Sequence, residues 1–287
     1  FALAVAVETY SGGKMGFAGD IGEEVMDMFR LKLAYFSATG TTRKVLHAVA
    51  EGMGLPFEEW DFTPPDSRRQ ERTAGPEDFV LFGAPVYAGR VPSFVTEYLQ
   101  RYVSGRETRC AVVGVYGNRE YEDFLLELAD TVQEKGFLPV AGAAFIGEHS
   151  LTDQIAPGRP DEQDLDMARR FGRELRERLD AGAGPLAEGV LPGRRPYRER
   201  GGGKPMSPET DASCRRCGLC AARCPMGAID PKNPFRVNED ACIHCLCCVR
   251  ICPVHAKAFC SEAYQQMVAS CIARFQYPRK EPEWFLG

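Results

Sequence analysis

The chain has 287 residues, of which 44% are hydrophobic and 26% charged, and its net charge is -5. This length makes two domains more probable than one. The acidic balance gives no electrostatic basis for binding nucleic acid or an anionic membrane surface, so neither partner is expected. No apolar run approaches the roughly 20 residues that span a bilayer, and membrane insertion is not expected. Nothing in the composition predicts an oligomeric state.

The first 27 residues show no clean hydrophobic period and are rich in glycine near their middle. No basic stretch precedes the apolar run at residues 1–7, which makes it a poor signal peptide. We interpret residues 1–27 as an extension of unknown role and Met28 as the functional beginning.

From residue 28 to 180, short apolar runs alternate with amphipathic stretches. The expected strands are Leu31–Phe36, Phe57–Phe62, Phe79–Ala84, Ala111–Tyr116 and Leu138–Phe145, and the expected helices are Thr42–Gly52, Ser93–Tyr102, Tyr121–Lys135 and Asp161–Leu179. Strands separated by helices favour a parallel sheet covered on both faces. The prediction is an α/β domain with a five-stranded doubly wound sheet, whose ligands bind beyond the carboxyl ends of the strands.

A second domain is expected after a linker. Seven Gly and five Pro fall between residues 181 and 210, a composition that cannot bury a core. We assign 181–207 as a solvated, extended linker and 208–287 as a small α+β domain. Its aromatic C-terminal tail could pack back on either domain.

Eleven of the twelve cysteines fall between Cys214 and Cys271, and such clustering indicates metal rather than disulfides. The exception, Cys110, precedes an apolar run and is interpreted as a small buried residue. Two runs have the spacing Cys-x2-Cys-x2-Cys-x3-Cys-Pro of bacterial two-cluster ferredoxins, in which the fourth cysteine binds the other cluster. The predicted ligands are Cys214, Cys217, Cys220 and Cys252 for one 4Fe-4S cluster, and Cys242, Cys245, Cys248 and Cys224 for the other. A zinc ribbon needs fewer cysteines than these two quadruplets supply.

Several residues of this region have no place in the ligand pattern. Cys247 is either a substitute ligand or an inert thiol, and the inert thiol is favoured. Cys260 and Cys271 lie outside the pattern, and His244 and His255 are interpreted as tuning or surface residues.

A phosphate site is predicted at the loop that follows the first strand and opens the first helix. Its hydroxyls and free amides suit a phosphate monoester at a helix N-terminus. The residues are Ser37, Thr39, Gly40, Thr41 and Thr42. The alternative is a simple Ser/Thr helix cap. The chain has no GxxxxGK[ST] and no GxGxxG motif, so ATP and dinucleotides bound through those motifs are not expected.

Two further loops at the ends of strands offer an aromatic face beside a glycine, as a flat isoalloxazine ring requires. The candidate ring contacts are Pro85, Tyr87 and Gly89 in the first loop, and Tyr116, Gly117 and Asn118 in the second. The alternative is that the tyrosines of these loops have a structural role and do not contact a flavin. His149, after the fifth strand, is expected to cap or pack rather than to line the flavin site.

The loops SATGTT, PVYAGRVP and VYGN resemble those of the flavodoxin family, and the two cysteine runs resemble bacterial ferredoxins. In this order, and with the phrases FIGEHS and GRPDEQDL, residues 28–287 look like the flavodoxin-ferredoxin fusion proteins of anaerobic bacteria and archaea. The resemblance implies FMN, two 4Fe-4S clusters and electron transport in the cytoplasm. It also implies redox partner proteins or small electron donors and acceptors.

The expected function is electron transfer between the clusters, which carry single electrons, and FMN, which carries one or two. No general-base constellation is visible, so the sequence leaves open whether the chain is a carrier or a small oxidoreductase. The alternative function is a redox-sensing module in which the cluster domain regulates partner binding.

Overall fold

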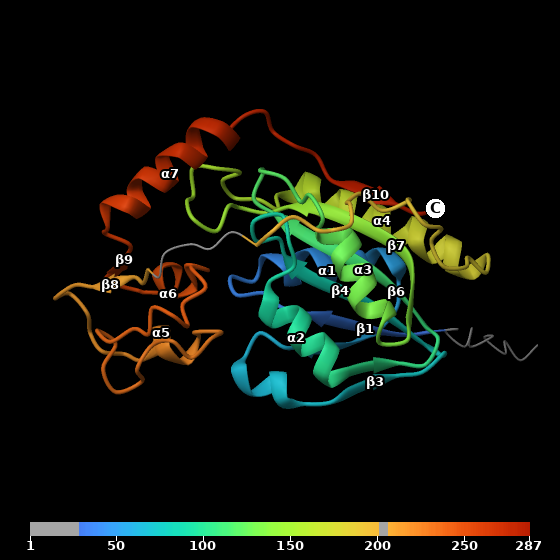
Figure 1. Ribbon diagram of the computed structural model, residues 1–287, viewed down its shortest axis with the longest axis horizontal. Coiled ribbons are helices and arrows are strands. Elements are labelled where there is room, and N and C mark those ends of the chain that lie inside the picture. The colour runs from blue at the N-terminus through green and yellow to red at the C-terminus, as the bar shows by residue number, and fades with distance from the viewer. Residues whose placement is uncertain (1–28, 201–205) are drawn as a thin grey trace, which may run out of the picture.

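The computed structural model describes residues 29–200 and 206–287. The expected extension, 1–27, and Met28 lie outside the described residues. Figure 1 shows a large α/β body with a small module beside it, helix α7 leading from the module toward the body, and the segment after α7 running across the body to β10.

The body is built on a sheet in the order β10-β7-β6-β4-β1-β2. Its strands are β1 (Arg30–Tyr35), β2 (Phe57–Asp61), β4 (Asp78–Pro85), β6 (Thr108–Tyr116), β7 (Phe137–Ile146) and β10 (Glu283–Phe285). All pairs are parallel except β10 with β7. The five parallel strands confirm the predicted doubly wound sheet, and their order is the one for which flavodoxins are the reference example.

Four helices cover the sheet, two on each face, and each begins and ends within three residues of its predicted bounds. They are α1 (Thr41–Met53), α2 (Ser93–Tyr102), α3 (Phe124–Gln133) and α4 (Glu162–Asp180). Helices α1 and α4 bury residues such as Val45 and Phe171 on one face, while α2 and α3 bury residues such as Leu99 and Phe124 on the other. A Cβ on Gly172 would lie 2.1 Å from the Val49 carbonyl oxygen, so this glycine lets α4 cross α1 closely. That crossing fixes the helix that opens from the SATGTT loop.

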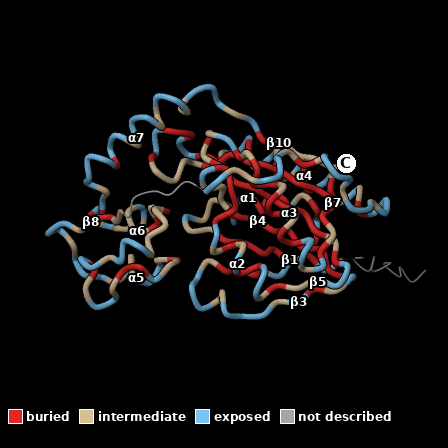
Figure 2. Tube along the Cα trace, viewed as in Figure 1, coloured by how far each residue is buried: buried red, intermediate tan, exposed pale blue. Residues whose placement is uncertain are grey.

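Smaller elements complete the description. They are the 3-10 helix η1 (Pro65–Arg69), the pair β3 (Arg72–Ala74) and β5 (Val103–Gly105), and in the module β8 (Glu209–Thr210), α5 (Leu219–Ala222), α6 (Cys247–Arg250), β9 (Lys257–Ala258) and α7 (Glu262–Phe275). Buried residues gather in the sheet and its helices and are sparse in the module (Figure 2). Among the described residues, no helix has both the length and the apolar character needed to cross a bilayer.

The linker differs from the solvated spacer expected from its composition, because residues 186–200 lie against the body. Leu191 is buried, and the Leu186 amide donates to the Pro139 carbonyl oxygen at 2.8 Å. Further along, Arg195 pairs with Asp130 at 2.5 Å and Arg200 pairs with Glu127 at 2.6 Å. Glycine and proline prevent regular structure here, but the interspersed leucines and arginines find partners on α3 and β7.

The C-terminal tail packs on the body as a sixth, antiparallel strand. Phe285 pairs with Gly142 in register, and the Trp284 ring lies 6.1 Å from that of Phe171. The Trp284 indole nitrogen also donates to Glu174 at 2.8 Å. A strand of three residues is too short to show a recognisable hydrophobic pattern in the sequence. Here the segment becomes a strand because it pairs with the edge of β7.

We expect Trp284→Ala to lower the free energy of unfolding of the body by about 2 kcal/mol, roughly half the cost of truncating a fully buried Trp, because this side chain is partly buried. Tyr277, 79% exposed in the same tail, offers a control: Tyr277→Ala should change stability by less than about 0.5 kcal/mol. Urea unfolding of both variants measures the difference. Equal stabilities of the two variants would show that the Trp284 side chain does not stabilise the body.

Candidate functional site

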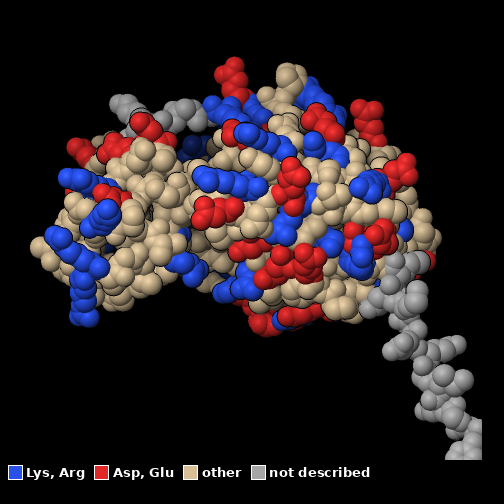
Figure 3. Space-filling view, turned by 90° about the horizontal axis from the view of Figure 1, so that it is seen from below, with Lys and Arg blue, Asp and Glu red and all other residues tan. Residues whose placement is uncertain are grey.

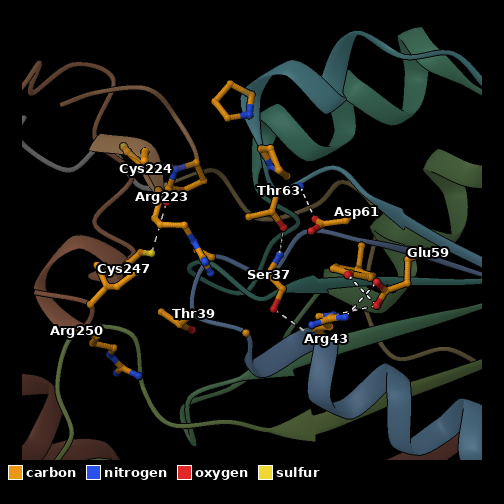
Figure 4. Close-up of a pocket in the computed structure, with 18 residues that line it drawn as sticks. Ser37, Thr39, Arg43, Glu59, Asp61, Thr63, Arg223, Cys224, Cys247 and Arg250 are labelled. Atoms are coloured by element: carbon orange, nitrogen blue, oxygen red, sulfur yellow. Dashed lines mark hydrogen bonds and ion pairs between the residues drawn. The ribbon is translucent and has the colours of Figure 1, made fainter. Parts of the chain in front are cut away.

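A cavity of about 690 Å³ lies between the carboxyl ends of β1 and β2 and the cysteine module, a volume that holds a cofactor of nucleotide size. The body contributes the Ser37–Gly40 loop and Thr63–Pro65. The module contributes Ala222–Pro225 and Cys247. Figure 4 shows these two sets of side chains facing one another, and Figure 3 shows the hollow between the two lobes with basic side chains along its rim.

The predicted phosphate loop lies on the body side of this cavity. Gly40 precedes α1 with φ +84°, a conformation that favours glycine. The Ser37 amide donates to Thr63 Oγ1 at 2.8 Å, and Ser37 Oγ accepts from the Arg43 amide at 3.1 Å. Thr39 Oγ1 lies 3.2 Å from Thr41 Oγ1. The loop thus holds hydroxyls beside the first amides of a helix, which have no acceptor within the helix.

Of the five residues predicted for the phosphate, three line the cavity: Ser37, Thr39 and Gly40. Thr41 contacts Thr39 but is not among the lining residues, and Thr42 is only 2% exposed. Thr63 was not identified from the sequence, although this residue closely follows the end of β2, the strand adjacent to β1.

Charges within the cavity are partly paired. Arg43 forms two hydrogen bonds with Glu59, at 2.9 and 3.1 Å, and these lower the pKa of that carboxyl to about 2. Arg250 pairs with Glu148 at 2.7 Å. The guanidinium of Arg223 forms no ion pair or hydrogen bond with any residue that the structure describes.

The predicted ring contacts do not line this cavity. The amide of Asn118, 3% exposed, donates to the Phe275 carbonyl oxygen at 2.7 Å and to that of Pro278 at 3.0 Å. Asn118 therefore holds the C-terminal segment, and its contact with a flavin ring stays a prediction. Tyr116 is buried against Tyr121, with ring centroids 5.4 Å apart.

The other ring candidates also lie elsewhere. A Cβ on Gly117 would lie 2.7 Å from the Cα of His149, and one on Gly89 would meet Glu122. Pro85 ends strand β4. Burial raises the pKa of the Tyr87 hydroxyl, and the nearby thiols of Cys245 and Cys247 raise it further. Tyr87 thus faces the cysteine module, and its contact with a flavin ring stays a prediction.

The cysteines surround two further cavities in the module. One is lined by Cys214, Cys217, Cys220 and Cys252, and the other by Cys224, Cys242, Cys245 and Cys248, with Cys247 as a fifth. Each space thus has three cysteines of one run and the fourth of the other. Within the described ranges, no three His, Cys, Asp or Glu side chains converge on a single ion site.

Cys224, Pro225 and Cys247 line both the interdomain cavity and the second cysteine cavity. Arg68 holds this junction, because its guanidinium donates to the Thr63 carbonyl oxygen at 2.8 Å and also to the Pro225 carbonyl oxygen. Burial raises the pKa of the Cys247 thiol, which donates to the Arg223 carbonyl oxygen at 3.5 Å.

Cys110 and three histidines, also singled out in the sequence, occupy the following positions in the structure. Cys110 is fully buried, as expected. His244 bonds the Met206 carbonyl oxygen at 2.8 Å, and His255 is exposed. His149 accepts from the Leu151 amide at 3.1 Å, in agreement with the expected packing role.

Comparison with known families assigns both parts of the chain. A family model described as a flavodoxin domain matches residues 32–145, and one described as a 4Fe-4S dicluster domain matches residues 213–256. The chain joins a flavodoxin domain to a 4Fe-4S dicluster domain. Its cofactors are FMN and iron-sulfur clusters. The hydroxyl-rich loop and the two cysteine-lined spaces are chemically suited to these groups.

Individual relatives cover parts of the chain. Pyruvate synthase subunit PorD of Methanocaldococcus jannaschii is 42% identical over 45 residues, which are 15% of this chain and 52% of that protein. The chain thus spans about half the length of this curated relative.

Among solved structures, an archaeal flavodoxin is 15% identical with a TM-score of 0.39, covering 53% of this chain and 99% of its own. The flavodiiron core of Flv1 from Synechocystis is 17% identical with a TM-score of 0.37, covering 55% and 37%.

A pH-dependent stability is expected from His149. Burial, followed by the charges of Arg119 and Arg250, lowers its pKa from 6.5 to about 4. Between pH 6.5 and 4, His149 binds a proton in the unfolded chain but stays neutral in the folded chain. The free energy of unfolding therefore has its full value above pH 6.5 and decreases as the pH falls toward 4.

His149→Asn keeps an acceptor for the Leu151 amide and removes the titration. Urea unfolding at pH 7.5 and 5.5 should therefore show a smaller loss of stability in this variant than in the parent protein. His255→Asn, at an exposed histidine with φ +52° that suits asparagine, should keep the parent profile. Identical pH profiles for parent and His149→Asn would contradict the assignment.

Proposed function

We propose that the protein relays electrons between two 4Fe-4S clusters in the module and FMN in the interdomain cavity. When bound, the clusters exchange single electrons and FMN one or two, so the chain couples one-electron and two-electron partners. The observation that carries the proposal is that the interdomain cavity, which would hold FMN, and the second cysteine cavity share three lining residues, Cys224, Pro225 and Cys247.

The two cysteine sets named above are the proposed cluster ligands. They supply thiolates from both runs to each space, as the spacing of two-cluster ferredoxins requires. The cluster held by Cys242, Cys245, Cys248 and Cys224 would lie next to the flavin. The other cluster would face outward, where Cys217 is exposed, and would exchange electrons with a redox partner.

For the flavin, we propose that the Ser37–Gly40 loop holds the phosphate. Hydroxyl groups and the free amides at the start of α1 are donors to an anion. Arg68 keeps the Cys224 turn against the loop after β2 and so keeps the two cofactor sites adjacent.

Thiolate ligands persist in a reducing compartment, so we place the protein in the cytoplasm. All twelve cysteines, each within the described residues, are free of disulfides. Whether the chain turns over a substrate of its own is not part of the proposal.

Cross-ligation can be tested by iron content. Cys224→Ala and Cys242→Ala should each remove iron from the same cluster, so the double variant should lose no more iron than one cluster holds. Cys220→Ala with Cys224→Ala should remove iron from both clusters, since these cysteines line different cavities. Cys247→Ala should keep its iron. If Cys224→Ala with Cys242→Ala loses both clusters, the pairing of ligands is wrong.

The relay itself predicts that, after reduction of the clusters by a low-potential donor, flavin reduction proceeds at a rate independent of protein concentration. Stopped-flow absorbance measures this rate. Arg68→Ala should slow it several-fold because the contact with Pro225 is lost, whereas Arg69→Ala, at the exposed neighbouring arginine, should not. Reduced clusters beside a flavin that stays oxidised would instead favour the redox-sensing function.

A further inference from the structure

The side chain of Arg223 occupies an unusual position, because it belongs to the cluster module yet lines the flavin cavity. It directly follows α5 and lies between Cys220 and Cys224. In Figure 4 it extends from the module toward the space in front of Ser37 and Thr39. It thus lies on the module's side of the cavity, opposite the loop that is proposed to hold the phosphate.

Its charge is available. Three arginines line the cavity, but Arg43 is held by Glu59 and Arg250 by Glu148. The Arg223 guanidinium forms no ion pair with any carboxylate in the described part of the chain. The same cavity is lined by the loop of amides and hydroxyls, which attracts an anion but brings no free cation of its own.

The backbone of Arg223 is held in place on both sides. Its carbonyl oxygen accepts from the Cys247 thiol at 3.5 Å, and its amide donates to the Leu219 carbonyl oxygen at 3.0 Å. Two residues later, the Pro225 carbonyl oxygen accepts from Arg68. The side chain therefore leaves from an anchored turn, which lowers the entropic cost of directing a guanidinium at an anion.

We propose that Arg223 binds the phosphate of FMN, so that the flavin site is built by both domains and the cluster module selects the phosphorylated flavin. This inference rests on the proposed function for the position of FMN. An arginine at a dianionic phosphate makes charge-assisted hydrogen bonds, which are about twice as strong as neutral ones. The flavodoxin domain alone would supply the neutral donors of its loop, because its own arginine in the cavity, Arg43, is paired with Glu59.

The test compares FMN with riboflavin, which lacks the phosphate, on the full chain with its clusters retained and its flavin removed. Dissociation constants come from quenching of flavin fluorescence. Arg223→Ala should raise the FMN dissociation constant about tenfold or more and leave that of riboflavin unchanged. Arg236→Ala, at an exposed arginine of the same module outside the cavity, should change neither. Unchanged iron content shows that the module is intact.

Other outcomes would overturn the inference. Equal weakening of FMN and riboflavin by Arg223→Ala would show that the residue supports the module rather than the phosphate. Arg223→Ala could instead leave FMN binding unchanged while the double variant Thr39→Val, Thr41→Val weakens FMN binding. That result would support the phosphate loop and the relay but would remove Arg223 from the site. A parent chain that binds no FMN would refute the proposed function and this inference together.

Discussion

The antiparallel pairing of β10 with β7 holds the cluster domain on the flavodoxin domain. The chain leaves the body through a segment anchored on α3 and returns through a segment anchored by Asn118. Both ends of the cluster domain are thus attached to the same body, with the module at the carboxyl ends of β1 and β2.

This double attachment creates the interdomain cavity. The flavodoxin domain contributes a loop rich in hydroxyls, and the cluster domain closes the opposite wall with Arg223, Cys224 and Cys247. A flexible tether would give a high effective concentration but no fixed geometry. The structure instead has interdomain hydrogen bonds at Arg68 and Tyr264, which fix the spacing between the proposed cofactor sites.

The sparse burial of the cluster domain has its own consequence. A module of this size cannot reach ordinary stability from its apolar core, and small domains commonly rely on bound metal. Iron-sulfur clusters would therefore stabilise the module as well as carry electrons. Because the same module closes the interdomain cavity, cluster assembly would also affect the proposed flavin site.

The sequence alone determined the elements and the chemistry. Periodicity placed the five parallel strands of the main sheet and the four helices that cover it, since these elements bury whole faces, and cysteine spacing revealed the cluster motifs. The position of Ser37–Gly40 after the first strand pointed to the phosphate loop. The tertiary structure decided the rest. Asn118 binds the tail, Arg223 enters the cavity from another domain, and the Gly/Pro-rich linker docks on the body. Each of these depends on a partner more than forty residues away in the chain, which only the folded structure brings near.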